Sequence, residues 1–156
     1  MKKVVIALDY GPTAQKVAEA GHALAKAMNA EVYLMHVISD PVYYSSTAYS
    51  PIMGFSGYVD LDPLRNDFMK SLLQSSQDFL TQTKNHLFDQ SIHTLVKEGE
   101  TADSILESAK ELSADIIVMG SHSRKWLEKI VMGSVTEKVL NQTSIPLFIV
   151  PTKKES

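Results

Sequence analysis

The chain of 156 residues is long enough to bury a core and short enough for one domain, expected over residues 1–156. Its composition, 44% hydrophobic and 21% charged, is ordinary for a soluble globular protein. A formal net charge of -3 gives no reason to expect DNA or RNA as a partner, and the absence of cysteine excludes disulfides, thiol catalysis and Cys-ligated zinc.

The first residues combine charge with an apolar stretch, as signal peptides do. Lys2 and Lys3 precede the apolar run Val4 to Leu8, which stops at Asp9. This run is too short for the hydrophobic region of a signal peptide, and no later run has transmembrane length. We therefore predict a buried first strand in a cytoplasmic protein without a membrane partner.

The first half of the chain alternates apolar runs of strand length with segments of helical period. Val4 to Leu8 is continuous and rich in β-branched residues, which is typical of a strand covered on both faces. Pro12-Thr13 starts a helix that extends to Met28, and Glu31 to Ile38 is the second strand. Apolar residues from Phe68 to Leu87 predict a long second helix.

The second half continues the alternation. Ile92 to Val96 is a third strand, Thr101 caps a helix, Asp115 to Met119 is the fourth strand, a helix begins at Ser134, and Pro146 to Pro151 is the fifth strand. This order predicts right-handed βαβ crossovers in a doubly wound α/β fold with helices on both faces of a parallel sheet. Ligands of such sheets bind beyond the carboxyl ends of the strands, so the residues after each strand are the candidates for function.

One connection, at about residues 39–64, is unusually long and rich in Pro, Ser, Gly and aromatic residues. Four of the six tyrosines lie in it, namely Tyr43, Tyr44, Tyr49 and Tyr58. Loops of this length are usually functional or disordered, and disordered segments lack aromatic residues. A lid over a ligand, an arm onto a partner subunit, and a loop that covers the core are the interpretations that stay open.

A pattern of small residues follows the fourth strand. Gly120-Ser121-His122-Ser123 is followed by nine residues and then by Gly133-Ser134. Small residues let a phosphate approach backbone N–H groups that a Cβ would block. A chance match of the two halves at this spacing is on the order of one in a hundred. Each half alone would indicate only a strand end and a helix cap.

The second half of the pattern predicts a helix start. Ser134 to Glu137 has the order of a capping box, in which Ser134 caps the helix. The free N–H groups and the positive dipole end of such a helix form an anion site without help from a lysine.

This pattern resembles that of the universal stress proteins, whose nucleotide-binding members carry Gly-x2-Gly-x9-Gly-[Ser/Thr] after the fourth strand. Here Gly120, Ser123, Gly133 and Ser134 occupy the four places, so serine replaces the second glycine. The resemblance extends over almost the whole chain. It includes Ile6 to Asp9, Leu34 to Ile38, the turn Val96 to Gly99, and the ending Ile145 to Pro151.

The resemblance implies a five-stranded sheet in the order 3-2-1-4-5, of the adenine-nucleotide α-hydrolase-like type, in a homodimer paired through the last strand. It also implies a site for ATP, or for ADP or AMP, with or without Mg²⁺. The resemblance implies that Asp9 contacts the ribose, that Ala7 and Val37 line the adenine pocket, and that Met119 and Gly120 follow the nucleoside. It implies that the phosphates are surrounded by Ser123, Arg124, Gly133, Ser134 and Val135. Leu8 and Thr136, which adjoin these residues, complete the candidate set.

The residues themselves support parts of this assignment. Asp9 follows the first strand, where a carboxylate suits ribose hydroxyls and would repel phosphates, although a helix-start or turn role is the alternative. Arg124, Lys125 and Lys129 add positive charge beside the loop, unless they only solvate an exposed helix. His122 lies within the loop, where it could donate a hydrogen bond to a phosphate.

No other pattern predicts a catalytic or metal site. The five histidines have no metal-ligand spacing, and His36, within an apolar strand, is interpreted as a core residue. The chain has no Walker A lysine, no Gly-x-Ser-x-Gly elbow and no evident base to activate water.

We therefore expect an ATP-binding regulatory protein of the stress response, in which nucleotide stabilises one conformation or dimer state. Leu147 to Val150 is an apolar edge strand, and two such edges can pair antiparallel about a two-fold axis. Two alternatives stay open. One is a protein-interaction module that binds no nucleotide, which Ser123 favours, and the other is a slow ATPase or phosphotransferase.

Whether the protein binds nucleotide depends on whether Ser123 can replace the second glycine of the family pattern. If the second glycine of the family pattern is needed for a positive φ, serine would cost about 1 kcal/mol or more in strain. If only small size is needed, serine fits and adds a hydroxyl donor for a phosphate oxygen. We expect the second case, because Gly120, Gly133 and Ser134 are all present.

Overall fold

The computed structural model describes residues 1–39, 62–122 and 132–152 of the chain. Residues 40–61 of the tyrosine-rich connection and the residues Ser123, Arg124, Lys125 and Lys129 lie outside these ranges. In chain order the elements are β1 (Lys3–Ala7), α1 (Ala14–Ala27), β2 (Glu31–Ile38), α3 (Asp62–His86), β3 (His93–Glu98), α4 (Thr101–Glu111), β4 (Ile116–Gly120), α5 (Ser134–Gln142) and β5 (Leu147–Val150).

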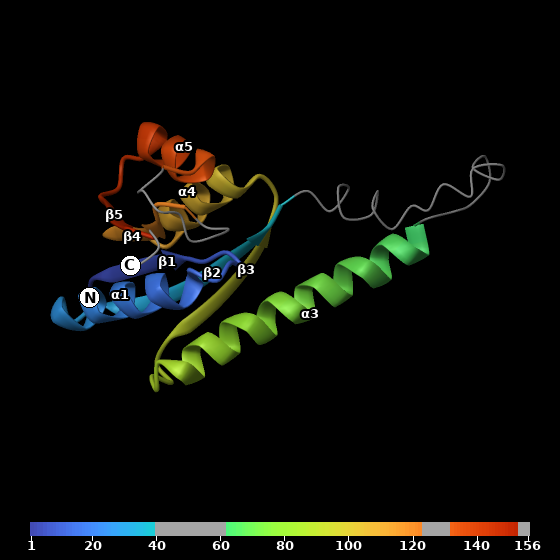
Figure 1. Cartoon of the computed structure of the whole chain (residues 1–156), viewed down its shortest axis with the longest axis horizontal. Coiled ribbons are helices and arrows are strands. Elements are labelled where there is room, and N and C mark those ends of the chain that lie inside the picture. The colour runs from blue at the N-terminus through green and yellow to red at the C-terminus, as the bar shows by residue number, and fades with distance from the viewer. Residues whose placement is uncertain (40–61, 123–131, 153–156) are drawn as a thin grey trace.

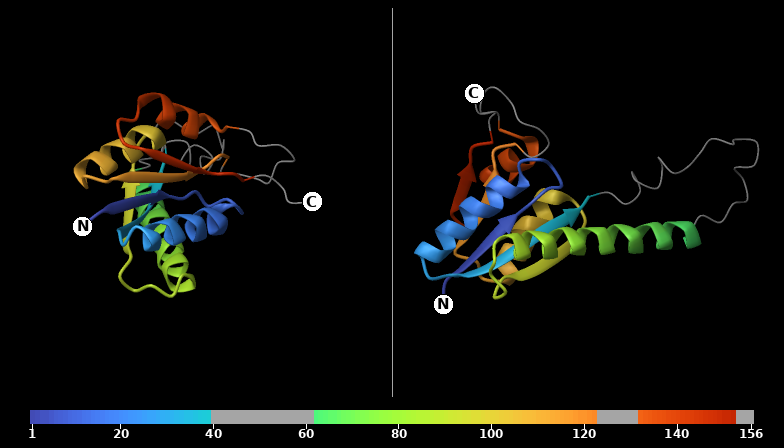
Figure 2. Two further views of the ribbon diagram at one scale, coloured as in Figure 1. Left: turned by 90° about the vertical axis from the view of Figure 1, so that its left-hand side faces the viewer. Right: turned by 60° about the horizontal axis from the view of Figure 1, so that its bottom comes forward.

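The five strands form one parallel sheet in the order β3-β2-β1-β4-β5 (Figure 1). This confirms the predicted fold class and strand order. Helices α1 and α3 cover one face of the sheet, and α4 and α5 cover the other (Figure 2). The chain therefore changes direction between β1 and β4, and the carboxyl ends of these two strands form the switch point at which such folds bind ligands.

The central strand β1 shows why the sequence is apolar without alternation. Val4, Val5 and Ile6 are each 0% exposed, because both faces of β1 are covered. Val4 and Ile6 pack toward α1 and α3, whereas Val5 packs toward α4 and α5. Burial stabilises the fold by about 1.5–3 kcal/mol for each side chain of this size.

Helix α3 is longer than the sequence pattern predicted. It begins at Asp62, before the expected start at Phe68, and its first half extends beyond the sheet (Figure 1). Its second half packs on β2 and β3, where Ser76 and Leu80 are fully buried. Among the described residues, no helix combines the length and apolar character needed to cross a membrane.

Two predicted helix caps are wrong by one residue. Thr101 is the first residue of α4, and Glu100 is its N-cap, with a side chain that accepts a hydrogen bond from Asp103 N–H at 2.7 Å. Ser134 is likewise the first residue of α5, whose N-cap is Gly133 with no side-chain hydrogen bond. The predicted capping box is therefore absent from α5.

The predicted turn from Val96 to Gly99 is also shorter than expected. Val96 to Glu98 continue strand β3. The chain turns only at Gly99, whose φ of 138° is strained for a residue with a Cβ.

Candidate functional site

A cavity of about 390 Å³ lies at the carboxyl ends of β1, β2 and β4, between them and the first turns of α4 and α5. Its volume suits a small-molecule ligand. Eleven of the thirteen predicted site residues line it, namely Ala7, Leu8, Asp9, Val37, Met119, Gly120, His122, Gly133, Ser134, Val135 and Thr136. The other two, Ser123 and Arg124, lie outside the described residues.

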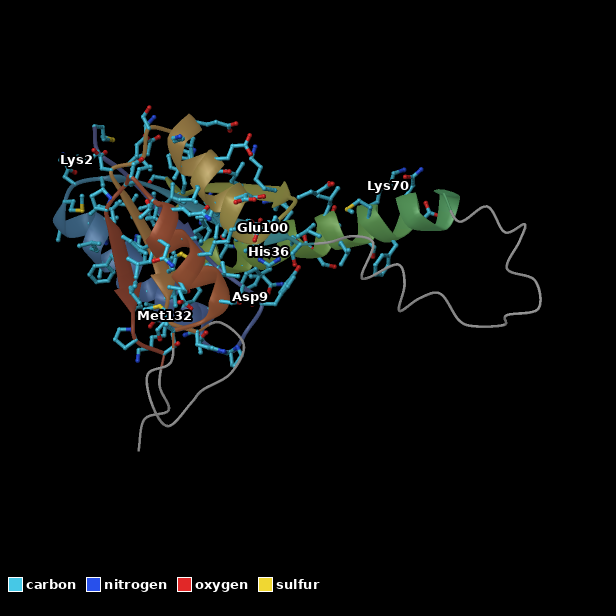
Figure 3. All side chains as sticks on the ribbon, turned by 90° about the horizontal axis from the view of Figure 1, so that it is seen from above. Lys2, Asp9, His36, Lys70, Glu100 and Met132 are labelled. Carbon is cyan, nitrogen blue, oxygen red and sulfur yellow. The ribbon has the colours of Figure 1, made fainter. Side chains whose placement is uncertain are left out.

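Six further residues line the cavity that the sequence did not indicate. They are Tyr10, Met35, His36, Ser39, Thr101 and Ile105. Asp9 and His36 lie together at this end of the sheet, away from Lys2 at the start of β1 (Figure 3). Tyr10 and Thr101 could have been found, because each follows the carboxyl end of a strand within a few residues.

Asp9 lies just beyond β1 and is partly exposed to the cavity. Its Oδ1 accepts a hydrogen bond from Tyr10 N–H at 2.7 Å. Its Oδ2 has no hydrogen-bond partner in the part of the chain that the structure describes. The bonded oxygen fits the turn role considered above, and the other oxygen can accept a hydrogen bond from a ligand hydroxyl.

The first turn of α5 is attached directly to the end of β4. Gly133 N–H donates to the carbonyl of Ser121 at 2.7 Å, and Thr136 Oγ1 donates to the carbonyl of Gly120 at 2.9 Å. The first intrahelical bond runs from Glu137 N–H to the carbonyl of Gly133 at 2.9 Å. The N–H groups of residues 134–136 therefore precede the helical hydrogen bonds and lie at the cavity wall.

The two glycines of the pattern serve different purposes. A Cβ on Gly120 would lie 3.0 Å from Val17 Cγ2 and 3.1 Å from Thr152 Cγ2, so a side chain there would crowd α1 and the segment after β5. This packing is a reason for a small residue at Gly120 that does not involve a ligand.

Gly133 has no such requirement. Its φ is -69°, which any residue adopts, and a Cβ would lie 3.4 Å from the carbonyl oxygen of Ser121, an ordinary contact. Neither backbone strain nor packing among the described residues demands glycine. Gly133 lines the cavity, so a ligand is a further reason for a small residue there.

The two helix N-termini at the cavity differ in their caps. The carboxylate of Glu100 caps α4, and Lys138 Nζ lies 3.2 Å from Glu100 Oε2 and 3.4 Å from Asp103 Oδ1. Although burial acts to raise it, the hydrogen bonds from Asp103 N–H and Lys138 hold the pKa of Glu100 below its ordinary value. The α4 terminus therefore has a carboxylate at neutral pH, whereas the α5 terminus has no side-chain cap.

His36 joins the cavity to α3. It is buried, as predicted for a core histidine, and its Nδ1 donates to the carbonyl of Leu8 at 2.8 Å. The Tyr10 ring lies edge-on to His36 at 4.6 Å between centroids and also contacts Phe79. Tyr10 OH donates to the buried Ser76 Oγ at 3.1 Å. These contacts fix the chain just after Asp9.

Three further histidines pair with carboxylates away from the cavity. His22 pairs with Asp89 at 2.8 Å, His86 with Glu19 at 3.0 Å, and His93 with Glu31 at 2.7 Å. Each pair links the α1–β2 segment to the α3–β3 segment. No group of three or more His, Asp or Glu residues arranged to hold a metal ion occurs within residues 1–39, 62–122 and 132–152.

Known proteins share both the sequence and the fold. A model of the Universal stress protein family matches residues 1–151. Universal stress protein MJ0531 of Methanocaldococcus jannaschii is 30% identical over 156 residues, which cover 99% of this chain and 84% of the relative.

Solved structures show the same architecture. The structure of MJ0577, from the same organism, matches with a TM-score of 0.74 and 25% identity, covering 99% of this chain and 97% of that one. A universal stress protein in complex with cAMP matches with a TM-score of 0.60 and 18% identity over 97% of this chain and 98% of that one. A universal stress protein from Archaeoglobus fulgidus in complex with dAMP matches with a TM-score of 0.57 and 20% identity, over 96% of this chain and 97% of that one. With a family model matched over residues 1–151 and this sheet order, the chain belongs to the Universal stress protein family.

Proposed function

We propose that this protein binds an adenine nucleotide in the cavity at the carboxyl ends of β1, β2 and β4. The phosphates lie at the N-terminus of α5, and the ribose lies at Asp9. The observation that carries the proposal is the difference between the two helix ends at the cavity. One has a carboxylate cap, and at the other the N–H groups of residues 134–136 have no acceptor among the described residues and lie beside a glycine that packing there does not require.

The position of the phosphates follows from the caps of the two helices. The Glu100 carboxylate, paired with Lys138, already occupies the N-cap of α4, where it accepts from Asp103 N–H. The start of α5 has no side-chain cap, and its dipole favours an anion. Gly133 leaves room for a phosphate oxygen to approach the backbone. We also propose that His122, Ser123 and Arg124, which follow β4 in the chain, donate hydrogen bonds to the phosphates.

The position of the nucleoside follows from the opposite side of the cavity. Ala7, Val37 and Met119 supply an apolar surface for the base, and the unpartnered oxygen of Asp9 accepts from a ribose hydroxyl. The known complexes of two structural relatives with cAMP and dAMP support an adenine base. We propose ATP, with or without Mg²⁺, as the ligand, with ADP and AMP as the alternatives.

We further propose that bound nucleotide stabilises one conformation or a homodimer of this cytoplasmic protein. Strand β5 lies at the edge of the sheet and, among the described residues, pairs only with β4. Phe148 on this strand is 40% exposed, and its neighbours Leu147 and Ile149 are half-buried. An apolar edge of this kind is suited to pairing with a second copy.

Mass spectrometry of gently purified protein tests the proposal. We expect an adenine nucleotide to copurify and to be released on denaturation. A protein that contains no small molecule, and that takes up none when incubated with millimolar Mg-ATP, would instead support the interaction-module alternative that Ser123 favours.

A further inference from the structure

Thr152 lies two residues beyond the end of β5 and is only 1% exposed. It does not line the cavity, and its side chain reaches the segment that follows β4. Its Oγ1 lies 3.0 Å from Ser121 Oγ, 2.9 Å from the nitrogen of His122 and 2.7 Å from the carbonyl oxygen of His122. One hydroxyl therefore contacts both polar groups of the His122 backbone.

The direction of each hydrogen bond can be assigned. The hydroxyl proton of Thr152 goes to the carbonyl of His122, because only a donor can satisfy that oxygen. Thr152 Oγ1 then accepts from His122 N–H and from the hydroxyl of Ser121. Ser121 Oγ in turn accepts from Thr152 N–H at 3.0 Å. The proton of each hydroxyl is therefore assigned, since Thr152 donates to the His122 carbonyl and Ser121 donates to Thr152.

The network reaches the two sides of the proposed phosphate site, the segment after β4 and the N-terminus of α5. His122 and Gly133 line the cavity. The carbonyl of Ser121 accepts from Gly133 N–H at 2.7 Å, and Ser121 N–H donates to the carbonyl of Val150 at 2.9 Å. The same two residues, Ser121 and His122, therefore connect Thr152 to the N-cap of α5.

We propose that Thr152 is a positioning residue for phosphate binding. Its hydroxyl, supplied from the end of the edge strand, holds the His122 peptide and, through Ser121, the N-terminus of α5. This inference rests on the proposed function. Positioning by a buried hydroxyl matters because a phosphate site requires several N–H groups to point at one place, and small shifts weaken all of them together.

A matched residue separates positioning from ordinary stability. Thr143, at the other end of α5, also makes two hydrogen bonds to backbone with one hydroxyl. It donates to the carbonyl of Ile145 at 2.7 Å and accepts from Ile145 N–H at 2.9 Å. Thr143 does not line the proposed site. Thr143 is half-buried where Thr152 is buried, but Thr143→Val removes a hydroxyl with the same kind of backbone bonds without touching the phosphate wall.

The experiment compares wild type, Thr152→Val, Thr152→Ser and Thr143→Val by calorimetry with adenosine, AMP and ATP. We expect Thr152→Val to weaken the binding of AMP and ATP at least tenfold and the binding of adenosine less than threefold. Thr152→Ser should restore the nucleotide affinity to within about threefold of wild type. Thr143→Val should leave the affinities for adenosine, AMP and ATP unchanged. Equal nucleotide affinity in Thr152→Val and Thr143→Val would overturn the inference, as would an equal loss for adenosine and ATP.

Hydrogen exchange in the ligand-free proteins provides a readout independent of nucleotide. We expect the His122 amide to exchange at least tenfold faster in Thr152→Val than in wild type or Thr143→Val, and Thr152→Ser to restore it. An unchanged rate would overturn the claim that Thr152 holds this peptide. A wild type that binds none of the three ligands would refute the proposed function, while the exchange rates would still decide whether Thr152 fixes the backbone.

Discussion

At the level of single residues, we expect substitutions at Gly120 and Gly133 to have different effects, the first mainly on stability and the second mainly on nucleotide binding. Gly120→Ala should lower the free energy of unfolding by about 1–3 kcal/mol, because the methyl group would press on Val17 and Thr152. Gly133→Ala should lower it by less than about 1 kcal/mol, the difference expected for a helix N-cap, and should mainly weaken nucleotide binding. Urea unfolding of both variants measures the first effect. Equal destabilisation by the two changes would contradict this division of roles.

Asp89 predicts a pH dependence of stability. The Ser91 hydroxyl and His22 hydrogen-bond to its carboxylate and lower its pKa from 3.8 to about 2, against the effect of burial. A pKa that is lower in the folded state adds stability above the unfolded value, and this stability is lost as the pH falls from about 4 toward 2.

Asp89→Asn should therefore reduce the free energy of unfolding by about 1–2 kcal/mol at pH 7. The gap between wild type and variant should narrow below pH 4, where the wild-type carboxyl begins to take up a proton. Urea unfolding of both proteins at several pH values between 7 and 3 measures this gap. A gap of constant size across that range would show that the charge of Asp89 contributes nothing.

At the level of elements, the start of α4 provides a test of charge at the cavity. Glu100→Gln removes the negative charge and keeps a side-chain oxygen for the cap. Nucleotide should bind the variant at least as tightly as wild type, with a gain of about twofold if the phosphates lie roughly 10 Å away. Glu107→Gln, elsewhere on α4, is the control in the calorimetric comparison. A tenfold loss of affinity in Glu100→Gln alone would mean that Glu100 contacts the ligand.

The elements also show how far sequence predicts this molecule. The strands, the sheet order and eleven cavity residues follow from apolar runs and from the family pattern, because these depend on local spacing. The start of α5 at Ser134 was predicted correctly, but the N-caps of α4 and α5 were each placed one residue late, because Thr and Ser are better N-caps by propensity than the residues before them. Tertiary contacts decide these ends, since Lys138 bonds to Glu100 and the Ser121 carbonyl holds Gly133.

Two of the residues missed by the sequence depend on contacts that are distant in the chain. His36 is held at the cavity by Leu8 and Phe79. Thr152 binds residues 30 and 31 positions before it. No local pattern indicates such a contact, and only the folded sheet brings the ends of β4 and β5 together.

At the level of the whole molecule, the edge strand β5 predicts self-association. Analytical ultracentrifugation at micromolar concentration should give the mass of a dimer. Phe148→Lys should shift it toward the monomer, because a charge on an edge strand opposes pairing. Phe88→Lys is the matched control, since Phe88 is 93% exposed at the end of α3 and lies outside β5. Dissociation by both substitutions, or by neither, would contradict pairing through this strand.

Calorimetry with Mg-ATP tests the central claim most directly. Wild type should bind with a Kd in the micromolar range, about -8 kcal/mol. Gly133→Val should abolish binding, because its side chain would fill the space proposed for a phosphate. Ser123→Gly should change the affinity less than about tenfold. If wild type shows no binding and Ser123→Gly restores it, the protein belongs to the class that binds no nucleotide, and the proposed function is wrong.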